Sequence, residues 1–86
     1  MARFKLFKGK LEGKGQKIWI LERTNPRTNK KFVSWFIKLE YSPRGIAKTP
    51  YVVGYGGKNK KRGVKYFPTK AKALKYINDF KRSKSR

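Results

Sequence analysis

An alternating run of side chains at residues 32–41 constrains the fold of this chain more than any other stretch. At the two-residue period of a β-strand, one side of the run is apolar throughout and carries Val33, Trp35, Ile37, Leu39 and Tyr41. The other side mixes aromatic, polar and charged groups and carries Phe32, Ser34, Phe36, Lys38 and Glu40. The pattern predicts a strand that gives one face to a core and presents the other face to a partner.

Four further segments have the composition of strands. We expect them at about residues 4–11, 17–23, 49–55 and 63–67. Asn25, Pro26 and Asn29 favour a chain reversal, which would fold the second strand against the third as a hairpin. Glycines and lysines dominate residues 54–63, which we therefore expect to form a mobile basic loop between the last two strands.

The last part of the chain has the pattern of an amphipathic helix at about residues 70–82. Thr69, directly after Pro68, is a favourable N-cap residue. Apolar side chains recur at helical spacing and form one stripe, made of Ala73, Leu74, Ile77 and Phe80. This stripe can cover the apolar face of the sheet, and residues 83–86 are expected to fray.

Together these elements predict one α+β domain over residues 1–86. The expected architecture is an antiparallel sheet of four to five strands followed by one C-terminal helix packed on one face. Residues 1–15 form either a basic arm or an edge strand anchored by Phe4, Leu6 and Phe7. A chain of this length has room for one small core.

The charge balance points to a polyanionic partner. The chain has 25 lysine and arginine residues against 4 acidic ones, a formal net charge of +21. Self-repulsion of this size is tolerated where a polyanion neutralises it, and we therefore expect a nucleic acid. Lysines number 18 and arginines 7, and lysine suits phosphates better than base edges. Affinity should be mainly electrostatic and sequence preference modest.

Other functions lack the residues that they need. The chain has no histidine or cysteine and its four acids are scattered, so no enzyme activity, metal or cofactor is expected. No apolar run approaches a transmembrane helix and no basic amphipathic helix is evident, which argues against a membrane partner. The absence of cysteine fits a cytoplasmic protein, on the nucleoid or, for a viral protein, in the host-cell cytoplasm.

Two groups of side chains make up the predicted site. Phosphate contacts are expected from Arg27, Lys30, Lys31, Arg44, Lys58, Lys60, Lys61, Arg62, Lys70 and Lys72. Base stacking or base contact is expected from Phe32, Phe36, Lys38, Tyr55 and Lys65. Exposed rings beside lysines would form a stacking platform, which favours single strands. The alternative is that a second layer or a homodimer partner covers these rings.

One resemblance supports single-stranded binding. The chain resembles the positive-cofactor-four type of single-stranded DNA-binding protein in three places. These are residues 32–45, residues 60–64, and Phe67 and Pro68 where a helix begins. The resemblance implies a curved antiparallel sheet followed by one helix, a dimer, and basic and aromatic sheet residues that grip unpaired strands. The chain departs from that family by the additional strand at 49–55 and by lacking the acidic and tryptophan residues usual where the helix begins.

A second resemblance points to duplex DNA. Residues 67–73 are similar to the helix start of the sheet-plus-helix domain of plant AP2 factors and of the N-termini of phage-type integrases, and residues 35–41 suit its first strand. This resemblance implies a sheet lying in the major groove. Lys72 stands where that family has a glutamate, and residues 54–63 are long for its loop.

The leading interpretation is single-stranded DNA binding of low sequence specificity, through lysine–phosphate contacts and aromatic stacking. One alternative is duplex DNA binding by the sheet, with Arg23 and Arg44 near bases. Another is a structural RNA-bound protein of ribosomal type, although DNA is favoured over RNA. An acidic protein partner would share the salt dependence. The small, lysine-rich chain suits a phage or mobile-element protein.

Overall fold

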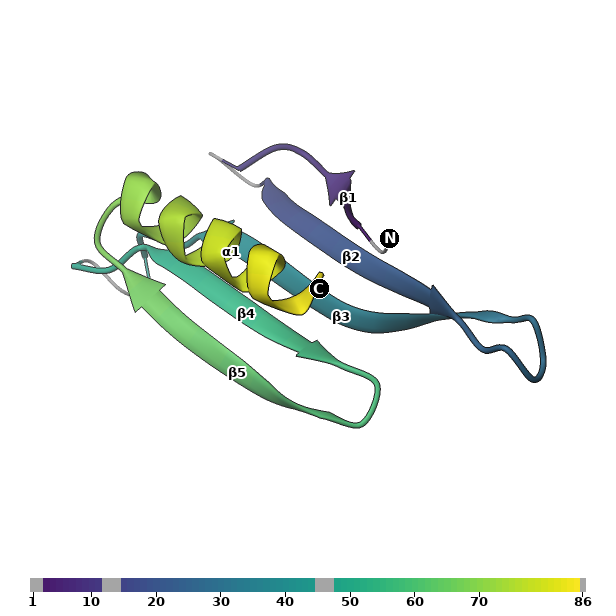
Figure 1. The fold of residues 1–86 in the computed structure, drawn as a ribbon. Coiled ribbons are helices and arrows are strands. Elements are labelled where there is room, and N and C mark those ends of the chain that lie inside the picture. The colour runs from purple at the N-terminus through teal and green to yellow at the C-terminus, as the bar shows by residue number, and fades with distance from the viewer. Residues whose placement is uncertain (1–2, 12–14, 45–47, 86) are drawn as a thin grey trace.

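The computed structural model describes residues 3–11, 15–44 and 48–85. In these ranges, five strands form one antiparallel sheet in which each strand pairs with the next in the chain, and one helix follows (Figure 1). The elements are β1 (Phe4–Lys8), β2 (Gln16–Thr24), β3 (Lys31–Tyr41), β4 (Tyr51–Gly57), β5 (Lys60–Phe67) and α1 (Lys70–Lys84). The predicted α+β fold is confirmed.

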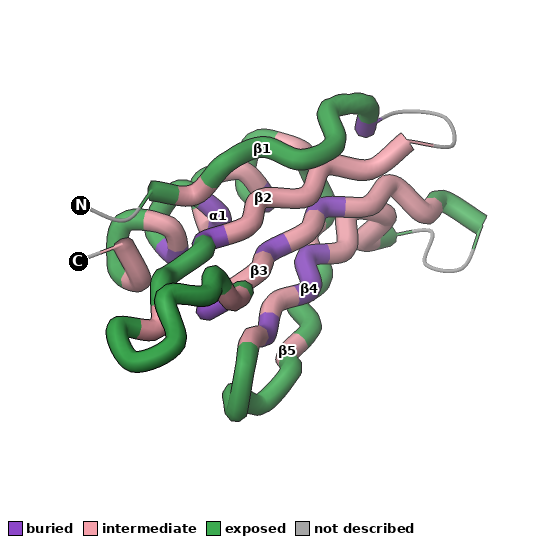
Figure 2. Tube along the Cα trace, turned by 90° about the vertical axis from the view of Figure 1, so that its right-hand side faces the viewer, coloured by how far each residue is buried: buried purple, intermediate pink, exposed green. Residues whose placement is uncertain are grey.

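Helix α1 packs on one face of the sheet, and the core lies between them (Figure 1). Side chains with no exposed surface come from both layers and include Ile37, Leu39, Val53, Ala73 and Ile77. Aromatic rings extend this core, since the Phe80 ring centroid lies 5.5 Å from that of Trp35 and 5.2 Å from that of Tyr55. The predicted helical stripe therefore belongs to the core, as expected from its spacing. Figure 2 shows the buried residues along β2, β3 and β4, with the two hairpin tips exposed.

The turn between β2 and β3 follows from its asparagines. The side-chain Oδ1 of Asn25 accepts a hydrogen bond from the backbone N–H of Arg27 at 2.9 Å. Asn29 adopts a φ of 58°, a left-handed conformation that asparagine tolerates better than most residues, and its N–H donates to the Asn25 carbonyl at 2.7 Å. The predicted reversal is present, and it sends β3 back along β2.

The connection between β4 and β5 differs from the predicted long loop. It is a two-residue turn at Lys58 and Asn59, in which Asn59 has a φ of 59° and Gly57 pairs with Lys60. Asparagine tolerates the left-handed conformation that this turn requires at its second residue. The glycines that suggested a mobile loop are residues of β4. Atoms of neighbouring strands approach β4 so closely at these positions that they leave little room for a side chain. At Gly57, a Cβ would collide with the backbone carbonyl oxygen of Ser34.

A register shift in β3 changes which side chains share a face. Leu21 pairs with Trp35 but Glu22 pairs with Val33, so Ser34 is passed over in the pairing. One extra residue in a strand reverses the side on which the following residues point. Beyond the shift, Phe32 therefore moves to the helix side of the sheet and Val33 to the opposite side.

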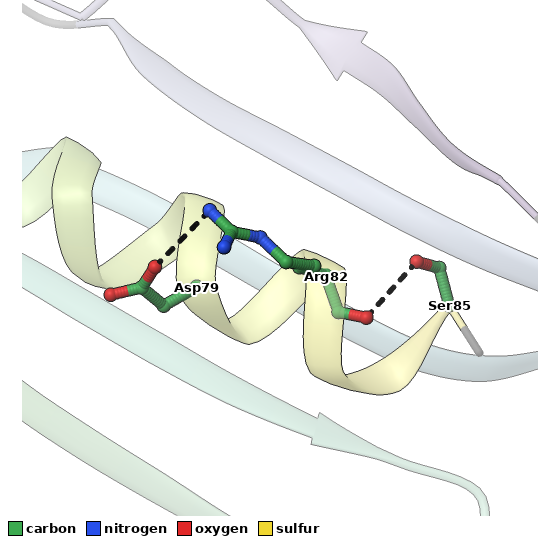
Figure 3. A network of polar contacts seen from close by, with 3 residues as sticks. All are labelled: Asp79, Arg82 and Ser85. Carbon is green, nitrogen blue, oxygen red and sulfur yellow. Dashed lines mark hydrogen bonds and ion pairs between the residues drawn. The ribbon is translucent and has the colours of Figure 1, made fainter.

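Helix α1 has a defined beginning and end. The Thr69 hydroxyl oxygen accepts a hydrogen bond from the Lys72 N–H at 3.3 Å, which confirms the predicted N-cap. The helix continues to Lys84, past the predicted end, and its basic last turn complements the negative end of the helix dipole. Arg82 also lies 3.6 Å from the Asp79 carboxylate, and the Ser85 hydroxyl donates to the Arg82 carbonyl at 3.4 Å (Figure 3).

Strand β1 occupies the first edge of the sheet, which places part of the expected basic arm in a regular element. Some residues of the predicted segments lie outside the described residues. They are residues 1–2 and 12–14 of the basic arm, residue 45 of the run compared with known families, and residue 86 of the expected frayed tail.

We expect Gly57→Ala to lower the free energy of unfolding by about 1–3 kcal/mol, the usual cost of overpacking. The obstructing atom at this position belongs to the backbone of Ser34 and cannot rotate away. Gly9→Ala is the matched control, because the heavy atom nearest its added Cβ is Leu6 Cδ2 at 3.9 Å. Urea denaturation measures both variants, and equal stability would contradict the close approach of β4 to β3.

Candidate nucleic-acid interface

The face of the sheet opposite α1 carries no covering element in the described part of the chain. Strand register brings Ile20, Phe36 and Gly56 level with one another, and Ile18, Lys38, Gly54 and Val64 form the next row. We call this surface the open face and define it by Ile18, Ile20, Phe36, Lys38, Val52, Val64 and Tyr66. Val64 and Tyr66 are 53% and 52% exposed, which is high for side chains of their type in the middle of a strand.

Two glycines of β4 shape the centre of the open face. A Cβ at Gly56 would lie 3.1 Å from Cε1 of Phe36 and 3.0 Å from Cγ of Arg62. A Cβ at Gly54 would lie 3.0 Å from Cε of Lys38. The Phe36 ring and the aliphatic parts of the two basic residues therefore lie across β4, in space that larger side chains would fill. Because β4 contributes no side chain here, an aromatic ring and two cations share one surface.

The charges on the open face are mostly positive. Lys5 and Lys8 of β1 pair with Ile20 and Ile18 of β2, so both lysines border the apolar centre. Lys38 Nζ lies 3.4 Å from a carboxylate oxygen of Glu40, and both side chains are about two-fifths exposed. Exposed pairs of this kind contribute at most about 1 kcal/mol, so Lys38 can exchange this partner for a phosphate.

The residues predicted to contact bases divide between the two faces. Phe36 and Lys38 lie on the open face, as the alternation indicated. Tyr55 lies under the helix, with its ring centroid 6.4 Å from that of Tyr76, and Lys65 pairs with the buried Val53. The structure therefore does not bring the predicted set together as one platform.

Phe32 also lies on the helix side, at the end of the sheet. It pairs with Arg23, whose Nη2 lies 3.5 Å from the carbonyl oxygen of Lys84 at the end of α1. The alternation alone placed Phe32 beside Phe36, and the register shift at Ser34 separates them. Nothing in the sequence around Ser34 indicates this one-residue bulge.

The predicted phosphate contacts fall at opposite ends of the sheet. At the end where β2 turns into β3 and β4 into β5, here called the hairpin end, lie Arg27, Lys30, Lys31, Lys58, Lys60, Lys61 and Arg62 (Figure 1). At the other end lie Arg44, Lys70 and Lys72. At that helix N-terminus, the backbone N–H of Lys72 is already bonded to the Thr69 hydroxyl. The hairpin end is thus the more concentrated region of positive charge.

A groove of about 600 Å³ separates the two hairpin tips. Arg23, Phe32, Ser34, Lys58 and Lys60 are among the residues that line it. Lys58 Nζ lies 4.9 Å from the centre of the Phe32 ring, and Lys60 Nζ lies 5.2 Å from the Trp35 ring. Arg23 was predicted only for the duplex alternative, and Ser34 was not in any predicted site, because the fold alone brings them next to the β4–β5 turn.

The perturbed titratable groups lie on the helix side. Burial lowers the pKa of Lys81, whose ammonium lies 4.9 Å from the Trp19 ring. Burial, followed by the charge and hydrogen bond of Tyr55, raises the pKa of Tyr76. Both groups contact the aromatic core under α1, and neither belongs to the open face.

The residues that the structure describes contain no cluster of three or more histidine, cysteine, aspartate or glutamate side chains able to hold a metal ion. Their helix is too short and too polar to cross a membrane. No protein-family model, curated protein or solved structure matches this chain. Function is therefore inferred from the geometry and charge of its own residues.

Glu40→Gln removes a carboxylate beside Lys38, and we expect tighter binding of a single-stranded oligonucleotide at low salt. The expected gain is roughly two- to five-fold, the effect of an exposed charge pair worth up to about 1 kcal/mol. Asp79→Asn is the matched control, because it changes the net charge equally on the solvent side of α1, where Asp79 pairs with Arg82. Fluorescence anisotropy measures the affinity of both variants. Equal gains would show that the net charge of the whole protein raises the affinity, and that the position of Glu40 on the open face has no effect of its own.

Proposed function

We propose that this protein binds single-stranded nucleic acid, with DNA favoured over RNA and with low sequence specificity. The observation that carries the proposal is the open face, where the Phe36 ring lies across Gly56 between the basic side chains Lys38 and Arg62. A ring among cations at this surface can stack a base while the cations hold neighbouring phosphates.

The shape of the open face favours an unpaired strand. Bases of a duplex are stacked on one another and present only their edges, whereas bases of a single strand are free to lie on a ring. Ile20 lies level with Phe36 on the neighbouring strand, and the rows beyond it on the open face add Ile18, Val64 and Val52. These supply contact area without hydrogen-bond donors, which supports binding regardless of base identity.

The composition supports low specificity. Lysine contacts to phosphates carry no sequence information, and the net charge of +21 makes such contacts abundant. Arginine, whose guanidinium can form two hydrogen bonds to the edge of a guanine, occurs 7 times in the chain, whereas lysine occurs 18 times. In this proposal the protein acts on cytoplasmic DNA, on the nucleoid or in the host cell of a virus.

A homodimer is compatible with this function only through certain surfaces. Both edge strands carry lysines, among them Lys5 and Lys8 of β1 and Lys60, Lys61 and Lys65 of β5. Like charges on exposed edges disfavour pairing between two sheets. We therefore expect any dimer to form away from the sheet edges.

Phe36→Ala should weaken binding of a single-stranded oligonucleotide by about 1–3 kcal/mol, the value of one stacked base. Because the change removes no charge, the slope of log affinity against log salt should stay the same. Phe36→Leu is the matched variant: it keeps an apolar side chain above Gly56 but has no aromatic face, and it should lose nearly as much affinity. Anisotropy titrations with single-stranded and duplex DNA of one sequence, at two salt concentrations, measure these effects.

Equal losses on single-stranded and duplex DNA would contradict base stacking on Phe36. If wild-type protein prefers the duplex, groove binding by the sheet is the better account. If it prefers structured RNA of the same length, the RNA-bound interpretation is the better one. Unfolding curves for each variant establish that the measured losses do not come from loss of the fold.

A further inference from the structure

The groove at the hairpin end differs in chemistry from the open face. It lies on the helix side of the sheet, between the β2–β3 and β4–β5 turns, and three cations line it: Arg23, Lys58 and Lys60. Its volume of about 600 Å³ is within the range of small-ligand sites. We call it the hairpin groove.

Two of these cations are held by aromatic rings. Lys58 Nζ lies 4.9 Å from the centre of the Phe32 ring, and Lys60 Nζ lies 5.2 Å from that of Trp35. Lys84 Nζ reaches the same tryptophan at 4.7 Å. The electrostatic attraction between a cation and a ring face restricts an otherwise mobile lysine. The contacts with Phe32 and Trp35 thus restrict two of the lysines that line the groove.

The third cation has a separate anchor. The Nη2 of Arg23 lies 3.5 Å from the Lys84 carbonyl oxygen, one of the terminal carbonyls at the negative end of α1. The remaining guanidinium hydrogens can donate elsewhere, since arginine has five. Side chains of Ser34 and Asn59 add polar groups to the same lining.

Phe32, the aromatic ring that lines the groove, is engaged differently from Phe36. Among the described residues, the cation–ring contacts involve Trp19, Phe32, Trp35 and Phe80, and none involves Phe36. A ring face occupied by an ammonium is less accessible to a base. The groove is therefore organised for phosphates, and the open face for bases.

We propose that the hairpin groove is a phosphate-binding site, in which Arg23, Lys58 and Lys60 hold backbone phosphates of a strand whose bases lie on the open face. This assignment rests on the proposed function. Phe32 is a positioning residue, because it acts through Lys58 and not through a base.

At the hairpin end, a bound strand has only a short distance to cover between the open face and the hairpin groove. Arg62 lies over Gly56 on the open face, and Lys60, two residues earlier in β5, points to Trp35 on the helix side. β5 is an edge strand, and within residues 3–11, 15–44 and 48–85 no further strand lies beside it to block passage from one face to the other. A backbone leaving Phe36 beside Arg62 therefore meets Lys60 and the groove next.

The test compares two double variants with the same loss of charge. Lys58→Gln with Lys60→Gln removes two groove cations, whereas Lys48→Gln with Lys75→Gln removes two exposed lysines that do not line the groove. For single-stranded DNA the salt slope falls by about 0.7 per lost phosphate contact, so the groove variant should lose about 1.4. The control should keep the wild-type slope.

A second comparison isolates the role of Phe32. Phe32→Leu should reduce affinity and the salt slope together, and equally for single-stranded and duplex DNA, because Lys58 is no longer held in place. Phe32→Tyr should restore both quantities, since it keeps the aromatic face. A merely structural role would change affinity without changing the slope.

Three outcomes are decisive. If wild-type protein does not bind nucleic acid, the proposed function is wrong and the phosphate assignment of the groove is overturned with it. If it binds but the salt slope falls equally in the groove variant and the control variant, the groove is not a phosphate-binding site. The net charge of the whole protein then accounts for the salt dependence. If Phe32→Leu weakens single-stranded binding alone, Phe32 stacks a base, and the phosphate assignment is overturned.

Discussion

The structure depends on one arrangement: across the described residues, a sheet of five strands is covered by a single helix. Helix α1 buries Ile37, Leu39 and Val53 on one face, and in the described part of the chain nothing packs on the other. An antiparallel sheet tolerates this arrangement because its second face can be solvated or can bind a partner. Here that face carries Phe36 among apolar side chains and cations, and this asymmetry underlies the proposed division between bases and phosphates.

Local backbone features adapt this simple fold to its surface chemistry. Gly54 and Gly56 leave β4 without side chains on the open face at these two positions, so that Phe36 and Lys38 of β3 can lie across it. The register shift at Ser34 then moves Phe32 to the helix side, beside Lys58. Two aromatic residues only four positions apart in sequence thereby acquire different environments.

Much of the fold was predictable because it depends on local patterns. The alternation at 32–41, the N-cap at Thr69 and the asparagine turn at 25–29 each correspond to a confirmed element. The site was less predictable, because strand register decides it: a shift of one residue reverses every following side chain. The same limit applies to β4, where glycines indicated a loop although cross-strand contacts make them strand residues.

The most direct test of the open face is amide chemical-shift mapping by two-dimensional ¹H–¹⁵N NMR, with a short oligothymidylate added to the protein. The account predicts the largest changes along the central rows of the sheet, at Ile18, Phe36, Lys38 and Val64, with further changes at the hairpin end. Changes confined to α1, or restricted to the turns while the amides of the open face stay unperturbed, would contradict it.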